Sequence, residues 1–186
     1  MTSDRKPEFS IVVALADVPP AGSEMRFEAS AAEREALARR FDLIELRSLK
    51  GTAALRPWRR IGFALEGRFE AEVVQACVVT LDPVEEKLDE RFRIHFLPAE
   101  LLEAEAGGAG SEREIVVDAD SEEPPEPILD GHIDIGEAVA EQLALALDPY
   151  PKKPGVVFGE AAPAGAAKAE ERPNPFAVLE KLKKKD

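Results

Sequence analysis

Residues 61–81, IGFALEGRFEAEVVQACVVTL, carry the clearest pattern in this 186-residue chain and indicate its fold class. Apolar side chains fill the odd positions of this stretch and charged side chains fill even ones. The apolar set is Ile61, Phe63, Leu65, Phe69, Ala71, Val73, Cys77, Val79 and Leu81. A period of two is typical of β-strands with one buried face. Because a single strand of this length is unusual, we expect a bend at Gly67.

The alternation continues on both sides of this stretch. After Pro83 it changes parity: the predicted inward set is Leu88, Phe92, Ile94 and Phe96, and the outward set is Asp89, Arg91, Arg93 and His95. Residues 43–55 alternate as well, and a slip near Ser48 predicts a β-bulge or a turn at Lys50 and Gly51. Together these segments predict an antiparallel β-meander, either a sheet or a partly closed barrel.

Two principal helices are predicted from their capping residues. Ser30 and Glu33 form a capping box that opens a helix through residue 40. Asp134 caps a second helix, with Glu137 three residues on, that runs to about residue 147. Its inward positions, at helical spacing, are Ile135, Val139, Leu143 and Leu147. The predicted fold class is therefore α+β, a β-meander packed with two principal helices.

The chain is expected to fold as one α+β domain over residues 1–158, followed by a disordered tail. A flexible acidic loop at about 103–127 interrupts the domain, because its sequence is polar and rich in Pro and Gly. Residues 159–172 predict a flexible linker, and residues 173–186 a short amphipathic helix. Its apolar stripe, the candidate partner-binding surface, is Phe176, Leu179 and Leu182. So short a helix needs a surface to fold against, on a partner or on its own domain; the alternative is a disordered end.

Composition limits the possible functions. The 37 acidic and 24 basic residues give a net charge of −13, which repels RNA phosphates at long range and suits a basic partner. One cysteine excludes an intramolecular disulfide, and two histidines offer little for zinc, so we expect a reducing cytoplasm and no cofactor or metal. No apolar run is long enough to cross a bilayer. Residues 9–16, FSIVVALA, predict a strand rather than a secretion signal, because acidic residues flank them and a proline-rich turn follows.

The single cysteine, Cys77, shares its register with the inward positions Val73 and Val79. Burial among apolar groups raises the pKa of a thiol and blocks access to it, which is the opposite of what a nucleophile needs. We therefore interpret Cys77 as a packing residue. The alternatives are a reactive thiol, with only His95 and His132 available as bases, and a metal ligand.

The local charge inverts between residues 34 and 60, which hold eight basic and three acidic side chains. The candidate RNA-binding residues at its end are Arg56, Trp58, Arg59 and Arg60. Arginines contact phosphates and tryptophan stacks on bases, so this patch can bind RNA even in an acidic protein. The alternative is that these arginines pair with the protein's own carboxylates while Trp58 fills a sheet end.

Acidic side chains also converge on the predicted start of the second helix: Asp130, Asp134, Glu137 and Glu141. Such a group can hold Mg²⁺ or act in acid–base chemistry. The alternative is structural, with Asp134 as the helix cap and the two glutamates favoured by the helix dipole. No phosphate-binding glycine loop accompanies the group, which favours the structural reading.

Three segments resemble the YceD-type family, named for large ribosomal RNA subunit accumulation, and its alphaproteobacterial branch in particular. They are QACVVTLDPV (75–84), ILDGHIDIGEAVAEQLALALDPYPKKPG (128–155) and NPFAVLEKLK (174–183). The motif residues are Cys77, Pro83, Asp134, Glu137, Glu141 and Pro149. Many members carry Cys-x-x-Cys before the proline, but Thr80 stands at the second position here. A metal role is therefore not carried over to this chain.

The resemblance implies a non-enzymatic ribosome biogenesis factor that supports accumulation of large-subunit (23S) ribosomal RNA in the cytoplasm. The expected mechanism is binding of a basic ribosomal protein or of an assembly intermediate, because an acidic surface speeds capture of a basic partner. One alternative is direct binding of ribosomal RNA by the Arg/Trp patch. A second is a Mg²⁺-dependent enzyme that uses the Asp134 group. Neither a membrane nor a small-molecule substrate is expected.

Overall fold

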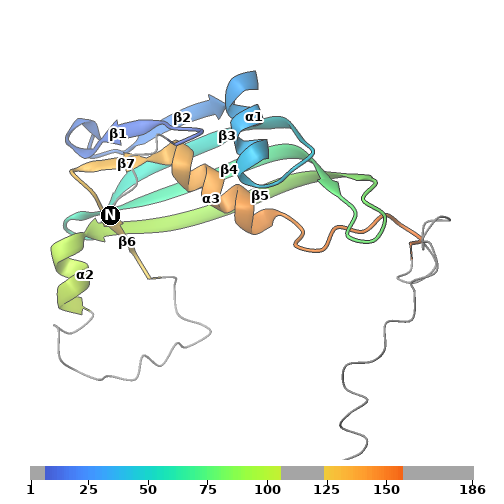
Figure 1. Ribbon diagram of the computed structural model, residues 1–186. Coiled ribbons are helices and arrows are strands. Elements are labelled where there is room, and N and C mark those ends of the chain that lie inside the picture. The colour runs from blue at the N-terminus through green and yellow to red at the C-terminus, as the bar shows by residue number, and fades with distance from the viewer. Residues whose placement is uncertain (1–6, 106–123, 157–186) are drawn as a thin grey trace, which may run out of the picture.

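The computed structural model describes residues 7–105 and 124–156. This part of the chain forms a five-stranded sheet, a two-stranded sheet and three α-helices (Figure 1). The strands are β1 (Val12–Ala14), β2 (Ser23–Glu28), β3 (Glu45–Trp58), β4 (Gly62–Ala76), β5 (Pro83–Pro98), β6 (Glu126–Ile128) and β7 (His132–Asp134). The helices are η1 (Leu15–Asp17, a 3₁₀-helix), α1 (Ala31–Arg40), α2 (Ala99–Glu105) and α3 (Ile135–Ala146).

The predicted antiparallel meander is confirmed in β2, β3, β4 and β5, each of which pairs with the next strand in sequence. β6 then adds to β5 in parallel, giving the strand order β2-β3-β4-β5-β6. The sheet is open, with β2 and β6 at its edges, so the partly closed barrel is not formed. Strand β2 was missed because its alternation covers only six residues after a proline-rich turn.

The hydrophobic core lies on one face of this sheet, where α1 and α3 cover it (Figure 1). The buried side chains predicted from the alternation include Leu65, Phe69, Ala71, Val73, Leu88, Phe92, Ile94 and Phe96. Two predictions of the same pattern are wrong: Ile61 is 51% exposed and Leu81 is 77% exposed. Both lie in turns beyond the ends of β4, where alternation no longer reports which face a side chain occupies.

Both principal helices begin where the capping residues predict. The Ser30 side chain and the Glu33 carboxylate form the capping box of α1. Asp134 caps α3 by accepting from the backbone N–H groups of Gly136 and Glu137. Helix α2 was not predicted, and it occupies the start of the segment that the sequence assigns to an acidic loop.

The N-terminal segment reaches the fold through a small second sheet. Here β1 pairs antiparallel with β7, immediately before α3 begins. The strand predicted over residues 9–16 is shorter in the structure, because Leu15 turns into the 3₁₀-helix η1. The Ile135 N–H donates to the Ile11 carbonyl at 2.9 Å, which fastens the start of α3 to this segment.

Two glycines predicted to interrupt strands lie within continuous ladders. Both ladders of β4 pass through Gly67 without a register shift, and Gly51 pairs normally within β3. A Cβ atom at Gly67 would lie 2.3 Å from the Phe92 ring, so the glycine makes room for that ring. The predicted bulge near Ser48 is confirmed, since the register of β3 against β4 shifts between Leu46 and Ser48.

Several predictions fall outside the described residues. These are the linker at 159–172, the helix at 173–186 with its stripe of Phe176, Leu179 and Leu182, and most of the acidic loop at 103–127. The domain boundaries therefore stay predictions. Within residues 7–105 and 124–156, no helix combines the length and the apolar character needed to cross a bilayer.

Candidate nucleic-acid interface

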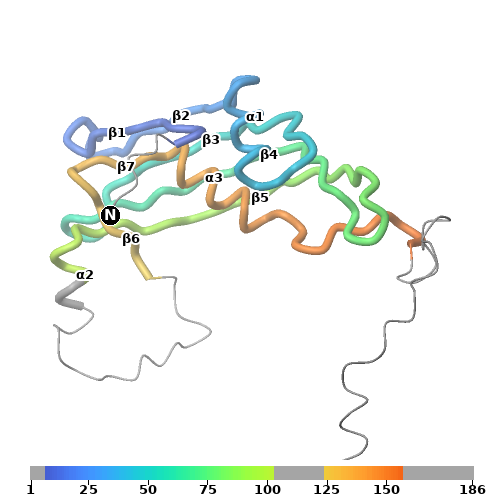
Figure 2. The backbone as a smooth tube through the Cα atoms, viewed as in Figure 1, coloured from blue at the N-terminus to red at the C-terminus, as the bar shows by residue number. Residues whose placement is uncertain are grey.

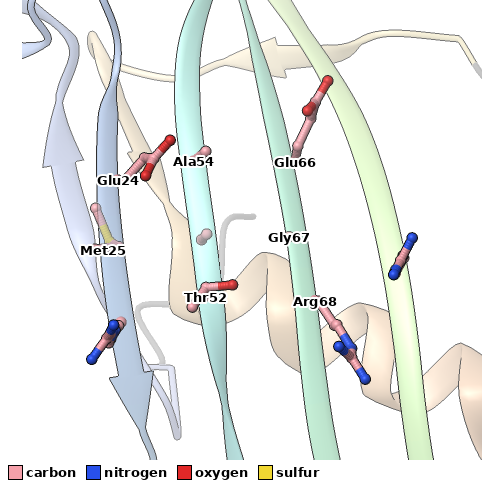
Figure 3. A pocket seen from close by; sticks show the side chains of 10 residues that line it. Glu24, Met25, Thr52, Ala54, Glu66, Gly67 and Arg68 are labelled. Atoms are coloured by element: carbon pink, nitrogen blue, oxygen red, sulfur yellow. The ribbon is translucent and has the colours of Figure 1, made fainter.

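The face of the sheet opposite the core carries a two-dimensional array of polar side chains, which we call the open face. Figure 3 shows part of it, with α3 passing behind the strands. Its members are even-numbered residues of β2, β4 and the part of β3 that follows its bulge, and odd-numbered residues of β5, because successive side chains of a strand point to opposite faces. Before the bulge the parity of β3 is reversed, so Arg47 also lies on this face. Cross-strand register therefore fixes which side chains are neighbours.

The predicted RNA-binding residues lie together at the end of β3. Trp58 is half-buried and stacks on His95 of β5, with ring centroids 4.1 Å apart and an interplanar angle of 22°. The Arg59 guanidinium lies 4.1 Å from the Trp58 ring centroid. Arg56 and Arg60 are exposed beside them. We call these residues and His95 the Trp58 patch.

This stacked arrangement suits a single-stranded nucleic acid. Bases stack on aromatic rings whatever their sequence, and arginine adds cation–π attraction and phosphate contacts. Sequence reasoning missed His95 as a member of the patch; its outward register was predicted, but its position beside Trp58 depends on the pairing of β4 with β5.

The alternative interpretation, in which these arginines pair with the protein's own carboxylates, holds for Arg56. The Arg56 guanidinium binds the Glu24 carboxylate at 2.8 Å, as expected if arginines neutralise the protein's own acids. Other ion pairs cross the open face: Arg93–Glu66 at 2.9 Å, Lys87–Glu72 at 2.8 Å, Arg47–Glu85 at 2.9 Å and Lys50–Glu70 at 3.7 Å. Exposed pairs of this kind contribute at most about 1 kcal/mol each, so a polyanion can compete for the arginines.

The charges nevertheless separate along the strands. Toward Trp58, a basic half contains Arg26, Arg56, Arg59, Arg60, Arg68, Arg91 and Arg93, with the acids Glu24 and Glu66. Farther along the strands, an acidic half contains Glu28, Glu70, Glu72 and Asp89, with Lys50 and Lys87. One face of the sheet thus presents a cationic area within a strongly acidic protein.

The Asp134 group serves the structure of α3. One Asp134 oxygen accepts from the N–H groups of Ile11, Gly136 and Glu137 at 2.8–3.2 Å, and the other accepts from the Ser10 hydroxyl at 2.6 Å. Glu137 binds Arg40 of α1 through two hydrogen bonds of 2.6 and 2.8 Å. The carboxylate that would anchor a Mg²⁺ ion is therefore occupied by the helix cap.

Glu141, one turn beyond Glu137, lies in a different environment. Desolvation raises the pKa of its carboxyl group, and the nearby charge of Glu137 raises it further. Asp130 lies in the turn before β7, where its carbonyl accepts from the His132 ring at 2.7 Å. Among the residues that the structure describes, no three His, Cys, Asp or Glu side chains are gathered as metal ligands.

Cys77 is fully buried, in the turn between β4 and β5. Its N–H donates to the Asp82 carbonyl at 2.8 Å, and the Lys153 N–H points at the sulfur from 3.5 Å. The expected rise in its pKa is wrong. The Thr80 hydroxyl and the backbone N–H groups of Lys153, Val79 and Thr80 lower the pKa of the thiol, and burial opposes them.

The segment after α3 closes over this turn. The Val78 N–H donates to the Pro151 carbonyl at 2.9 Å, and the Gln75 amide donates to the Asp148 carbonyl at 3.0 Å. Figure 2 shows this segment passing the turn between β4 and β5. The motif residues of the resemblance thus form two groups. One lies in or beside this turn: Cys77, Pro83 and Pro149. The other lies at the N-cap and in the first two turns of α3: Asp134, Glu137 and Glu141.

Comparison with known proteins matches the chain to one family. The family model described as large ribosomal RNA subunit accumulation protein YceD matches residues 65–183, from β4 to beyond the described part of the chain. No curated protein and no solved structure matches the chain. Since the match spans more than half of the 186 residues and includes both groups of motif residues, the chain belongs to the YceD family of large ribosomal RNA subunit accumulation proteins.

Proposed function

We propose that this protein supports the accumulation of large-subunit ribosomal RNA by binding that RNA through the Trp58 patch, without catalysing a reaction. Family membership supplies the role in large-subunit RNA accumulation. The observation that supports direct contact is the stack of Trp58, His95 and Arg59 at the basic half of the open face. Stacking and phosphate contact are the two interactions by which proteins hold single-stranded RNA without reading its sequence.

The overall charge shapes how such binding works. A net charge of −13 repels RNA at a distance, but salt screens charges beyond about 8 Å at physiological ionic strength. Attraction by the basic half therefore acts only near contact. We expect moderate affinity and association that is not accelerated by long-range steering, which suits a factor that visits a precursor particle and leaves it.

Capture of a basic ribosomal protein is a second candidate. It is favoured by the acidic half of the open face, where Glu28 has no ion pair among the described residues. Complementary charge would speed the encounter and weaken with added salt. The two candidates use opposite halves of one face, so substitutions can separate them. A catalytic role for Asp134 is less favoured, because its carboxylate oxygens already accept hydrogen bonds from the chain.

The first test uses Trp58 as its own reporter, since it is the only tryptophan in the chain. Titration of the full-length protein with single-stranded oligonucleotides from large-subunit ribosomal RNA should quench its fluorescence. The triple variant Arg56→Glu, Arg59→Glu, Arg60→Glu should abolish crosslinking to the same RNA. Trp58→Ala should weaken binding by about 5- to 150-fold, because stacking on an aromatic side chain contributes about 1–3 kcal/mol per base.

The matched control is Arg39→Glu, which reverses one exposed charge on α1, away from the open face. It should crosslink like the unaltered protein. Equal crosslinking by the triple variant would refute RNA binding by the patch. Recovery of a basic ribosomal protein at moderate salt, abolished by Glu28→Lys with Glu70→Lys and unaffected by the arginine substitutions, would instead support the second candidate.

A further inference from the structure

Three arginines from three different strands form a line across the open face. The register pairs Arg26 of β2 with Thr52 of β3, Thr52 with Arg68 of β4, and Arg68 with Arg91 of β5. We call these four residues the arginine row. Since neighbouring strands lie roughly 5 Å apart, the row extends across about 15 Å of the sheet. It contains no acidic side chain.

The arginine row is a local electrostatic conflict. Arg68 and Arg91 are directly opposite each other, and like charges in that position destabilise a sheet. Arg68 is neutralised by Asp89, whose two carboxylate oxygens accept from its Nε at 2.6 Å and from its Nη2 at 2.5 Å. Arg26 and Arg91 form no ion pair with the described part of the chain. Violations of this kind are expected where function requires them.

A hollow of about 500 Å³ lies over the row. Figure 3 shows its floor, where Thr52 and Ala54 present small side chains between the longer ones of β2 and β4. Arg26, Arg68 and Arg91 line one side, and Glu24 and Glu66 line the other. A ligand backbone can therefore approach the strands closely between the arginines and the two glutamates. Guanidinium groups bind phosphate oxygens in a bidentate manner.

We propose that the arginine row binds the phosphodiester backbone of single-stranded RNA, as a second subsite continuous with the Trp58 patch. This inference rests on the proposed function and adds a division of roles: the patch stacks bases, and the row holds phosphates. Trp58 lies six positions beyond Thr52 in β3, so these two residues are about 20 Å apart along one strand. Between Trp58 and the level of Thr52 lie Arg56 of β3, which belongs to the Trp58 patch, and Arg93 of β5, each paired with a glutamate. An acidic peptide would use the row but would gain nothing from the stacked rings.

The test combines Arg26→Ala and Arg91→Ala in the full-length protein, with Arg34→Ala and Arg39→Ala on α1 as the charge-matched control. Fluorescence anisotropy with a labelled single-stranded RNA should show about tenfold weaker binding for the double variant. The control should bind as tightly as the unaltered protein. The slope of log Kd against log salt should fall by about 1.4, or about 0.7 for each lost phosphate contact. The thermal midpoint should stay the same or rise, because repulsion along the row is relieved.

An abasic oligonucleotide separates the two subsites, since it has phosphates but no bases. Its binding should be lost in the double variant and unchanged in Trp58→Ala. Thr52→Glu, which places a carboxylate in the middle of the row, should also abolish it, while Thr52→Ser should not. Abasic binding that is unaffected by Arg26→Ala with Arg91→Ala would refute the phosphate subsite and leave the proposed function standing. Failure of the unaltered protein to bind any RNA would overturn both.

Discussion

At the scale of single residues, the Cys77 side chain has polar groups around its sulfur and is still inaccessible to solvent. Its sulfur receives the Lys153 N–H and the influence of Thr80, yet its side chain is 0% exposed. A lowered pKa favours the reactive thiolate, but a reagent must first reach the sulfur. Access therefore decides its reactivity, and the segment that follows α3 lies against this turn through the Val78–Pro151 and Lys153–Cys77 hydrogen bonds.

A bulky thiol reagent should label Cys77 in the native protein far more slowly than in the denatured protein. The matched control is Val78→Cys in a Cys77→Ala background, because Val78 is 46% exposed in the same turn and should be labelled rapidly. The measurement is the rate of thiol modification, with circular dichroism to verify the fold. Rapid labelling of Cys77 with the fold intact would contradict its interpretation as a packing residue.

Glu141 gives a prediction about pH, because desolvation and then the charge of Glu137 raise the pKa of its carboxyl group above 4.5. The folded protein then holds this proton more tightly than the unfolded chain does. Its contribution to stability is present below pH 4.5 and is lost as the pH rises through the raised pKa. Glu141→Gln should therefore raise the thermal midpoint at pH 7 and lose that advantage near pH 4. Glu28→Gln, an exposed charge on β2, is the control; equal effects of the two variants would argue against a special environment at Glu141.

At the scale of elements, cross-strand register determines which residues of the candidate interface meet. The Arg56–Arg60 cluster could be found in the sequence because its members are consecutive. The arginine row could not, because Arg26, Arg68 and Arg91 are brought into line only by three strand pairings. Alternation predicts which face of the sheet a side chain occupies. A register shift of two residues between strands would leave every side chain on its face, but it would move the three arginines out of line. The bulge between Leu46 and Ser48 shows that the register of this sheet does shift, there by one residue.

The close approach of β4 and β5 at Gly67 provides a test of the register. Gly67→Ala should cost about 1–3 kcal/mol in the free energy of unfolding, because the new methyl group would overlap the Phe92 ring. The same substitution in a Phe92→Leu background should cost less, because leucine has no ring at that position. Denaturant unfolding of the four proteins in this cycle measures the coupling. Additive effects would show that Gly67 and Phe92 are not in contact.

At the scale of the whole molecule, composition alone gives a misleading picture of what the surface can bind. The −13 charge correctly describes an acidic protein, but it averages over a sheet face whose two halves differ in sign.

The α+β class, the meander and both capped helices could be predicted from the sequence, because local periodicity and capping encode them. The parallel strand β6 and the second sheet could not, since each pairs segments that are distant in the sequence and only three residues long.

The pairing of β1 with β7 also determines the order in which parts of the nascent chain can fold. Ile11 and Asp134, which hold the start of α3 together, are 123 residues apart. At a synthesis rate of about 5–20 residues per second, β1 waits roughly 6–25 s for its partner. The β2–β5 meander has no such delay, because each strand pairs with the next one made. Docking of α3 over the sheet is therefore a late step of folding, and the rate of translation sets when it can occur.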